Sequence, residues 1–208
     1  MIIIASYNNL TFLERLLQNL LAIDLCGQKI IIVDSIDLGI ATKYPAFTFE
    51  IKNTTDYDTG SYLYAIKKYP NENFYILLHD SVEVIRIDFV KSITMRLKKS
   101  PVVAFWGFRY FYDTPEQKQW VESDLNVSTL PEKLIFGPTF AITNTALRTL
   151  PKPWLQKLPS KKIEACGMER RWSLMFHILK IPVDFVDELE VRKIRTGTYL
   201  RKYRGNRE

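Results

Sequence analysis

The chain has 208 residues, 47% of them hydrophobic and 13% aromatic, which suits one α/β domain with one sizeable core. Two cysteines exclude a disulfide framework, and no apolar run approaches the roughly 18 residues that a membrane-spanning helix needs. The net charge of +6 does not by itself indicate nucleic acid, because the stretch from Arg192 to the end alone holds seven Lys or Arg against one Glu.

The first half of the chain alternates short apolar runs with helical patterns. The runs are too short for helices, and uniformly apolar runs are typical of strands buried on both faces of a parallel sheet. We therefore expect a doubly wound α/β unit with right-handed crossovers. The expected strands cover residues 2–5, 29–33, 47–51 and 74–78, and the expected helices residues 10–21 and 60–68.

The second half has a different pattern. Residues 102–112 are strongly aromatic, residues 134–143 contain a Gly-Pro break, and residues 169–179 have helical apolar spacing. These features predict a mixed sheet, with a loop at the Pro-Lys-Pro of residues 151–153. No repeat or Gly/Ser linker divides the halves, so we expect residues 1–208 to form a single domain.

The cysteines and the N-terminus indicate the compartment. Neither Cys26 nor Cys166 has a zinc-type spacing, so we expect both to be buried thiols. The opening MIIIASYNN lacks the basic and apolar regions of a secretion signal. We therefore expect a cytoplasmic protein without a membrane span.

Polar residues follow three of the expected strands. In an open α/β sheet, ligands bind beyond the carboxyl ends of the strands. An aromatic ring with amide or carboxylate groups can stack on a pyrimidine base and accept its imide N–H, and a further carboxylate can hold a divalent cation against a diphosphate. The sequence thus predicts a nucleoside-diphosphate site. Its candidates are Ser6, Tyr7 and Asn8 after the first strand, Asp34 after the second, and His79, Asp80 and Ser81 after the fourth.

Other nucleotide-binding classes lack their motifs here. No G-x-G-x-x-G follows the first strand, which disfavours a dehydrogenase or methyltransferase, and no G-x-x-x-x-G-K-[ST] is present, which excludes a P-loop kinase. A basic nucleic-acid-binding domain has only the overall charge and the C-terminal tail in its favour.

Four segments resemble the inverting GT-A glycosyltransferases related to family 2: ASYNN, IIIVDS, DTGSYLYAI before FYILLHDSVEV, and GMERRW. The resemblance covers the chain to about residue 190 and extends to a viral transferase domain that glycosylates a capsid protein. It implies a GT-A (Rossmann-like) α/β fold, with a mixed, mainly parallel sheet flanked by helices. It also implies a nucleotide-sugar-binding half (1–100), an acceptor-binding half (101–190) and a basic tail (191–208).

The resemblance assigns roles to the strand-end residues. The metal-binding DxD of the family falls on His79-Asp80-Ser81, which keeps a single aspartate, Asp80, as the ligand for Mn²⁺ or Mg²⁺. One carboxylate with phosphate oxygens and waters is a weaker cage than two carboxylates. The remaining assignments are Ser6, Tyr7 and Asn8 to the base pocket, Asp34 to the uracil or ribose, and Asp58 and Gly60 to the ribose and diphosphate.

Inverting transfer needs a carboxylate that takes a proton from the acceptor hydroxyl. Glu169 is the predicted base, placed at the start of a helix where it faces the cleft. Glu164 is the first alternative and Asp113 the second. Among the aromatic residues of the second half, Trp106 is the candidate for contact with a sugar.

The predicted activity is transfer of a hexose or 6-deoxyhexose from a UDP-sugar to a glycan or glycoprotein acceptor, as in viral capsid glycosylation. Several of these residues have ordinary structural alternatives: Asp34 can cap a turn, and His79 can be a hydrogen-bonded packing residue. A catalytically silent sugar-nucleotide or glycan-binding module is the alternative function, which the single aspartate of the His79-Asp80-Ser81 segment favours. The sequence leaves the donor sugar, the acceptor and the oligomeric state open.

Overall fold

The computed structural model describes residues 1–7, 9–34, 39–52, 56–137, 139–186 and 191–193. Asn8 and most of the basic tail therefore lie outside the described residues. The strands are β1 (Ile2–Ser6), β2 (Ile30–Asp34), β3 (Thr48–Ile51), β4 (Phe74–His79), β5 (Val82–Val84), β6 (Val102–Ala104), β7 (Gly107–Arg109), β8 (Lys133–Ile135), β9 (Phe140–Thr143), β10 (Val183–Phe185) and β11 (Val191–Lys193). The helices are α1 (Leu10–Leu21), α2 (Tyr57–Lys68), α3 (Phe89–Leu97), α4 (Pro115–Glu122), α5 (Asn144–Thr149), α6 (Lys152–Gln156) and α7 (Lys162–Ile178).

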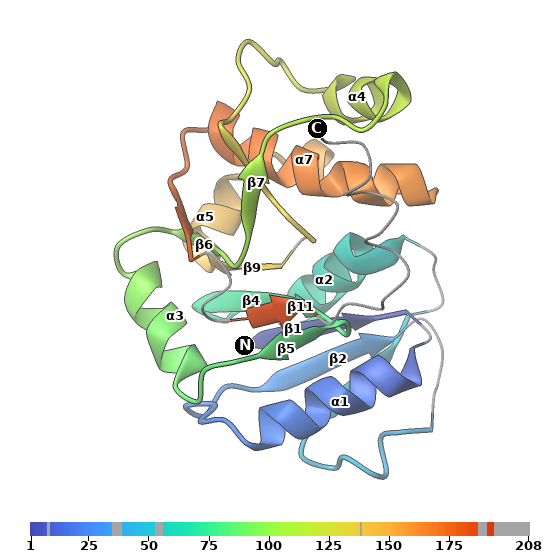
Figure 1. Cartoon of the computed structure of the whole chain (residues 1–208), viewed down its shortest axis with the longest axis vertical. Coiled ribbons are helices and arrows are strands. Elements are labelled where there is room, and N and C mark those ends of the chain that lie inside the picture. Colours follow the sequence, from blue (N-terminus) through green and yellow to red (C-terminus); the bar gives the residue numbers. More distant parts are fainter. Residues whose placement is uncertain (8, 35–38, 53–55, 138, 187–190, 194–208) are drawn as a thin grey trace, which may run out of the picture.

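A mixed, mainly parallel sheet organises the described residues (Figure 1). Its strand order is β10-β6-β9-β4-β1-β2-β3. β1 runs parallel to β2 and β4, β2 runs parallel to β3, and β6 runs parallel to β10. β9 is antiparallel to both β4 and β6, and two small ribbons, β5 with β11 and β7 with β8, lie outside the sheet. The predicted α/β class is confirmed.

Helices cover both faces of the sheet, because successive side chains of a strand point in opposite directions. Ile3 and Ala5 of β1 belong to a core with α2 and α7, whereas Ile2 and Ile4 belong to a core with α1 and α3. In Figure 1, α2 and α1 accordingly lie on opposite sides of β1 and β2. Residues from both halves of the chain contribute to each core.

Three helix positions differ from the predictions. α2 begins at Tyr57, three residues before the predicted start, and α7 begins at Lys162, seven residues before its predicted start. The Pro-Lys-Pro segment starts the short helix α6 where a loop was predicted, since a proline is tolerated in the first turn of a helix. No described helix is long and apolar enough to cross a membrane.

Candidate functional site

The carboxyl ends of three adjacent strands bring polar side chains together. Ser6 at the end of β1 lies in register with Asp34 at the end of β2, and both side chains are buried. On the other side of β1, Ala5 pairs with His79 of β4, and the amide of Asp80 donates to the carbonyl of Ala5 at 3.0 Å. The chain order therefore places the predicted residues Ser6, Asp34 and Asp80 at one edge of the sheet.

Asp80 stands in an acidic environment. Burial, with the carboxylates of Asp58 and Asp34 nearby, raises the pKa of Asp80 to about 7. The backbone amide of Tyr7, 3.4 Å from Oδ2, and the hydroxyl of Ser6 act in the opposite direction. Among the described residues, Asp80 forms no ion pair with a lysine, arginine or histidine. Asp80 is therefore only partly ionised at neutral pH, and a bound positive charge would favour its ionised form.

Helix α2 contributes Asp58 and Tyr62 to the same environment. The two residues are four apart and so lie on one face of the helix. Tyr62 is fully buried, and its hydroxyl has no hydrogen-bond partner among the described residues. Burial, with Asp58 and Asp80 adding to it, raises the pKa of Tyr62 well above its ordinary value. Tyr62 was not among the predicted site residues, although its spacing from Asp58 was a signal.

Asp34, Asp58 and Asp80 form the acidic cluster of this site. A pair of stacked tyrosines borders it. The rings of Tyr7 and Tyr57 lie 5.9 Å apart with an angle of 19° between their planes, and Tyr7 keeps 51% of its surface exposed. The ammonium group of Lys162, at the start of α7, lies 5.9 Å from the centre of the Tyr57 ring. An exposed aromatic face beside buried polar groups is a surface on which a planar base can stack. Tyr57, absent from the predicted site, has a φ of 53° at the first residue of α2.

His79 and Gly60 have evident structural contacts. His79 is buried, and its Nδ1 lies 2.7 Å from the hydroxyl of Ser81, as expected for a packing histidine held by a hydrogen bond. A Cβ atom at Gly60 would collide with the carboxylate of Asp56, which forms an ion pair with Lys52. The close approach to Gly60 is thus made by a side chain of the protein itself.

The acidic cluster fits a cation shared with a ligand better than a cage made of protein alone. No group of three or more His, Cys, Asp or Glu side chains suited to a metal occurs among the described residues. Mg²⁺ and similar ions are commonly bound by one or two carboxylates together with substrate phosphates. Burial of Asp80 beside the carboxylates of Asp58 and Asp34, and the hydroxyl of Tyr62 that has no partner among the described residues, fit such a partly built site.

Glu169 does not start a helix, contrary to the prediction. α7 starts at Lys162, and its N-terminus is capped by Glu164, whose carboxylate accepts from the amides of Ser160 and Lys161 at 2.7 and 3.3 Å. Burial alone would raise the pKa of Glu164, but these hydrogen bonds lower it. Glu164, the first alternative base, is thus engaged as a helix cap, and Glu169 lies in the interior of the helix.

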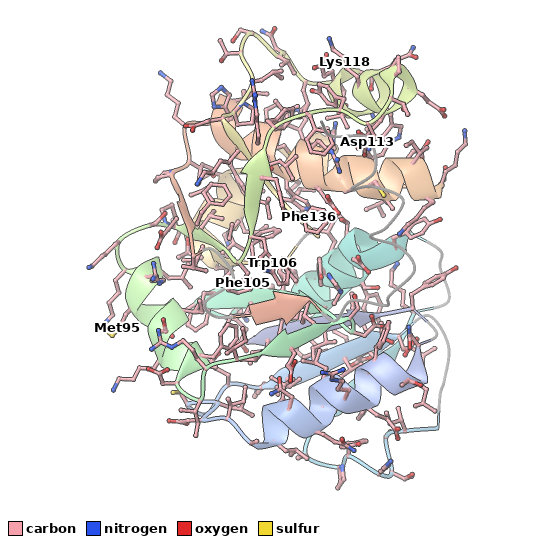
Figure 2. All side chains as sticks on the ribbon, viewed as in Figure 1. Met95, Phe105, Trp106, Asp113, Lys118 and Phe136 are labelled. Carbon is pink, nitrogen blue, oxygen red and sulfur yellow. The ribbon has the colours of Figure 1, made fainter. Side chains whose placement is uncertain are left out.

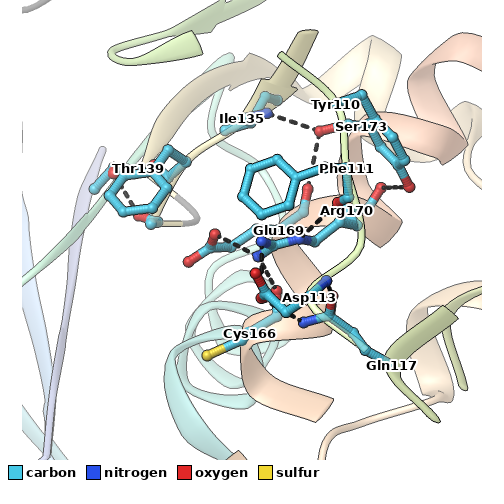
Figure 3. A network of polar contacts seen from close by, with 12 residues as sticks. Tyr110, Phe111, Asp113, Gln117, Ile135, Thr139, Cys166, Glu169, Arg170 and Ser173 are labelled. Carbon is cyan, nitrogen blue, oxygen red and sulfur yellow. Dashed lines mark hydrogen bonds and ion pairs between the residues drawn. The ribbon is translucent and has the colours of Figure 1, made fainter. Parts of the chain in front are cut away.

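Glu169 extends toward the edge of the sheet that holds Asp80. Leu77 of β4 pairs with Phe140 of β9, so Thr139, just before β9, lies beside the end of β4. In Figure 3, the Glu169 carboxylate points to the side where Thr139 lies. α7 also packs against α2, the helix that carries Asp58, on the same face of the sheet.

The guanidinium of Arg170 joins Glu169 to Asp113 (Figure 3). Nη1 lies 3.0 Å from Oε2 of Glu169, and Nη2 lies 3.0 Å from Oδ2 of Asp113. Asp113 was predicted only as a second alternative base. The structure places Glu169 and Asp113 on one cation.

Two further predictions for side chains are wrong. Trp106, predicted to contact a sugar, is 3% exposed and packs in the core beside Phe105. Figure 2 shows it inside the molecule, in contrast to the exposed Met95 on the outside of α3. The cysteines are not buried thiols, since Cys26 is exposed in the turn between α1 and β2 and Cys166 is half-buried. Cys26 has a φ of 49°, which is typical of a turn rather than of a core position.

Two cavities of about 360 Å³ each lie in the second half of the chain. Neither cavity is lined by residues of the acidic cluster. The candidate site is therefore identified by the position of its residues at the strand ends and by their charge, not by the volume of a cavity. The first is lined by Pro131, Glu132, Lys133, Ile135, Ser173, Phe176, His177, Ile181, Val183 and Phe185, and the second by Arg109, Tyr110 and residues 130–133.

No protein-family model matches the sequence, and no curated protein matches it. Solved structures do match. A mannosyltransferase from Pyrobaculum calidifontis, in complex with GDP-Man and Mn²⁺, has a TM-score of 0.63 at 13% identity, over 95% of this chain and 57% of that one. GalNAc-T7 with UDP, GalNAc and Mn²⁺ has a TM-score of 0.61 at 12% identity, over 94% and 44%. A CMP:2-keto-3-deoxy-manno-octonic acid synthetase complexed with CTP has a TM-score of 0.55 at 11% identity, over 90% and 88%.

These similarities show a GT-A-like fold that glycosyltransferases and cytidylyltransferases share. The identities are too low to carry more than the fold. The chain spans about half the length of the two matched glycosyltransferases and most of the length of the matched synthetase.

Proposed function

We propose that the chain is a glycosyltransferase that uses a nucleoside-diphosphate sugar. The observation that carries the proposal is that Ser6, Asp34 and Asp80 gather at the carboxyl ends of three adjacent strands, with Asp58 of α2 close enough to raise the pKa of Asp80 further than burial alone does. The exposed, stacked pair of Tyr7 and Tyr57 lies beside these residues. An aromatic ring for a base, polar groups for a ribose and a carboxylate for a cation-bound diphosphate are the groups that a nucleotide-sugar donor requires, and strand ends are where such ligands bind in open α/β sheets.

The donor residues have separate roles in this proposal. The nucleobase stacks on Tyr7, with Ser6 and Asp34 as its polar partners, and the sequence resemblance adds Asn8, which lies outside the described residues. Asp58 and Gly60 lie by the ribose and diphosphate, and Asp80 is the protein ligand of Mn²⁺ or Mg²⁺, with His79 next to it in the chain. The cation, when bound, neutralises the charge that develops on the departing diphosphate.

Glu169 is the proposed catalytic base. The acceptor hydroxyl oxygen forms a bond to the anomeric carbon of the donor sugar while its proton passes to the Glu169 carboxylate. The bond between the anomeric carbon and the phosphate oxygen breaks, and its electron pair leaves with the nucleoside diphosphate. Attack opposite the leaving group inverts the configuration, which is the outcome that the sequence resemblance implies.

The sequence resemblance also supports a finer proposal for the substrates. UDP is the expected nucleotide, the donor sugar is a hexose or 6-deoxyhexose, and the acceptor is a glycan or glycoprotein such as a viral capsid protein. The second half of the chain, with the exposed ring of Phe108 on β7, is the proposed acceptor side.

Nucleotidyl transfer is the second candidate. The match to the CMP:2-keto-3-deoxy-manno-octonic acid synthetase favours it, because that match covers most of both chains. The two activities release different products, since a glycosyltransferase frees a nucleoside diphosphate and a nucleotidyltransferase frees pyrophosphate. Product analysis with UDP-sugars and with CTP plus a sugar acid separates them.

The first experiment is calorimetric titration of UDP into the wild-type protein and the Asp80→Ala variant, with and without Mn²⁺. We expect micromolar binding that weakens tenfold or more, which is about 1.4 kcal/mol or more, when either Mn²⁺ or Asp80 is removed. Asp88→Ala is the matched control, because Asp88 is exposed and pairs with Arg86 outside the site. Absence of UDP binding under every condition would refute a UDP-sugar transferase.

A further inference from the structure

Arg170 is a buried cation with two acidic partners. Its side chain is 4% exposed, against 12% for Glu169 and 23% for Asp113. Both ion pairs have nitrogen–oxygen distances of 3.0 Å. One positive charge therefore serves two carboxylates, and this group of three side chains carries a net charge of −1 when both acids are ionised.

The rest of the guanidinium is held by the backbone. Nη1 donates to the carbonyl of Cys166 at 2.8 Å and Nε donates to the carbonyl of Phe111 at 3.3 Å. The guanidinium carbon lies 4.9 Å from the centre of the Phe111 ring. Asp113 is fixed in turn, since the side-chain amide of Gln117 donates to its Oδ2 at 3.1 Å. These contacts hold the Arg170 guanidinium in one orientation, and the guanidinium in turn holds the Glu169 carboxylate.

We infer that Arg170 and Asp113 are positioning residues that set the orientation and the proton affinity of Glu169. Arg170 holds the Glu169 carboxylate in place and favours its ionised form. Asp113 offsets part of that effect, because it takes one side of the guanidinium and adds a negative charge. The inference deepens the proposed function, since it rests on Glu169 as the base.

The two positioning residues act on Glu169 with opposite signs. A nearby cation stabilises a carboxylate and lowers its pKa, whereas a nearby anion raises it. Removal of the Arg170 charge should therefore raise the pKa of Glu169, and removal of the Asp113 charge should lower it. Among the described residues, the titratable or charged groups that interact with members of this network include Cys166 and Lys162 on α7, Tyr110 and Tyr112 after β7, and Glu122 on α4.

The test follows the Glu169 carboxyl carbon by NMR as a function of pH, in protein labelled with ¹³C in the glutamate carboxyl groups. The Glu169→Gln variant identifies the signal. We expect Arg170→Met to raise the titration midpoint by about one pH unit or more, and Asp113→Asn to lower it by roughly half a unit or more. Arg170→Lys, which keeps the charge, should stay closer to the wild type than Arg170→Met.

The pH dependence of sugar transfer gives the second readout. Its acidic limb should move to higher pH in Arg170→Met and to lower pH in Asp113→Asn. Asp113→Asn replaces one carboxylate oxygen by an NH₂ group at a partly exposed position and should leave the fold intact. It therefore tests the direction of the Glu169 pKa shift even if the buried Arg170→Met variant does not fold. Midpoints that stay at the wild-type value, or that both move in one direction, would overturn the inference. Failure of wild-type transfer would refute the proposed function, while the NMR titration still decides the inference.

Discussion

Replacement of Asp80 by asparagine should stabilise the metal-free protein, and the gain should depend on pH. The folded protein raises the pKa of Asp80 from 3.8 to about 7. Between these values the folded protein holds a proton that the unfolded chain has lost. The folding free energy that protonated Asp80 contributes is fully present below about pH 4 and is lost as the pH rises through about 7. At pH 8 the wild type therefore keeps an unfavourable buried charge that Asp80→Asn lacks.

The size of the effect follows from the pKa difference. A shift of about 3 units at about 1.4 kcal/mol per unit gives roughly 4 kcal/mol as the upper value at pH 8. An asparagine oxygen can still accept from the Tyr7 amide, so the hydrogen bond on Oδ2 has a replacement. The gain should shrink as the pH falls and vanish below about pH 4, where Asp80 becomes protonated in both states.

Urea unfolding of the wild type and of Asp80→Asn at pH 5, 6, 7 and 8, without divalent cations, measures this gain. Asp88→Asn is the control: Asp88 is exposed, and its pKa is lowered by hydrogen bonds from Arg86 rather than raised. Addition of Mn²⁺ with UDP at pH 8 should stabilise the wild type and leave Asp80→Asn unchanged. A difference between the two proteins that stays constant from pH 5 to pH 8 would refute the reasoning.

Two further predictions concern stability. Gly60→Ala places a methyl group against the carboxylate of Asp56, which must move away from Lys52; alanine's higher helix propensity offsets part of the cost, so the net loss of unfolding free energy should be about 1 kcal/mol, and the same substitution in an Asp56→Ala background should cost nothing. An equal loss in the Asp56→Ala background would show that the collision is not the cause. Arg171→Met removes the two hydrogen bonds to Asp124, at 2.8 and 2.6 Å, but Asp124 is 37% exposed and keeps its ion pair with Lys157, so urea unfolding should show a loss of about 1–3 kcal/mol. A loss below about 1 kcal/mol would contradict the structural role of that ion pair.

The strands and the polar residues at their carboxyl ends were predictable because their signals are local. A buried strand of a parallel sheet is a short apolar run, and the four predicted strands of the first half match β1 to β4 within one residue at each end. The residue that follows such a run lies at the edge of the sheet. The apolar pattern alone therefore predicts that Ser6, Asp34 and Asp80 lie at a common edge, and the strand register places them there.

The helix starts were less predictable, because capping depends on a few polar contacts. Glu169 was placed at a helix start since the apolar spacing becomes regular only after it. The structure begins α7 seven residues earlier, where Glu164 accepts from the amides of Ser160 and Lys161. The predicted burial of Cys26 was wrong for a similar reason: an apolar residue type in a turn has no core to enter.

The sequence by itself determined the α/β class, the order of strand and helix along the first half, and which polar residues follow the strands. Only the tertiary structure decided which side chains meet there. Arg170 contacts Asp113, 57 positions earlier in the chain, and Tyr7 at the end of β1 stacks on Tyr57 of α2. The physical reason is that periodicity reports the face of an element to which a residue belongs. The partner across that face depends on how distant elements pack.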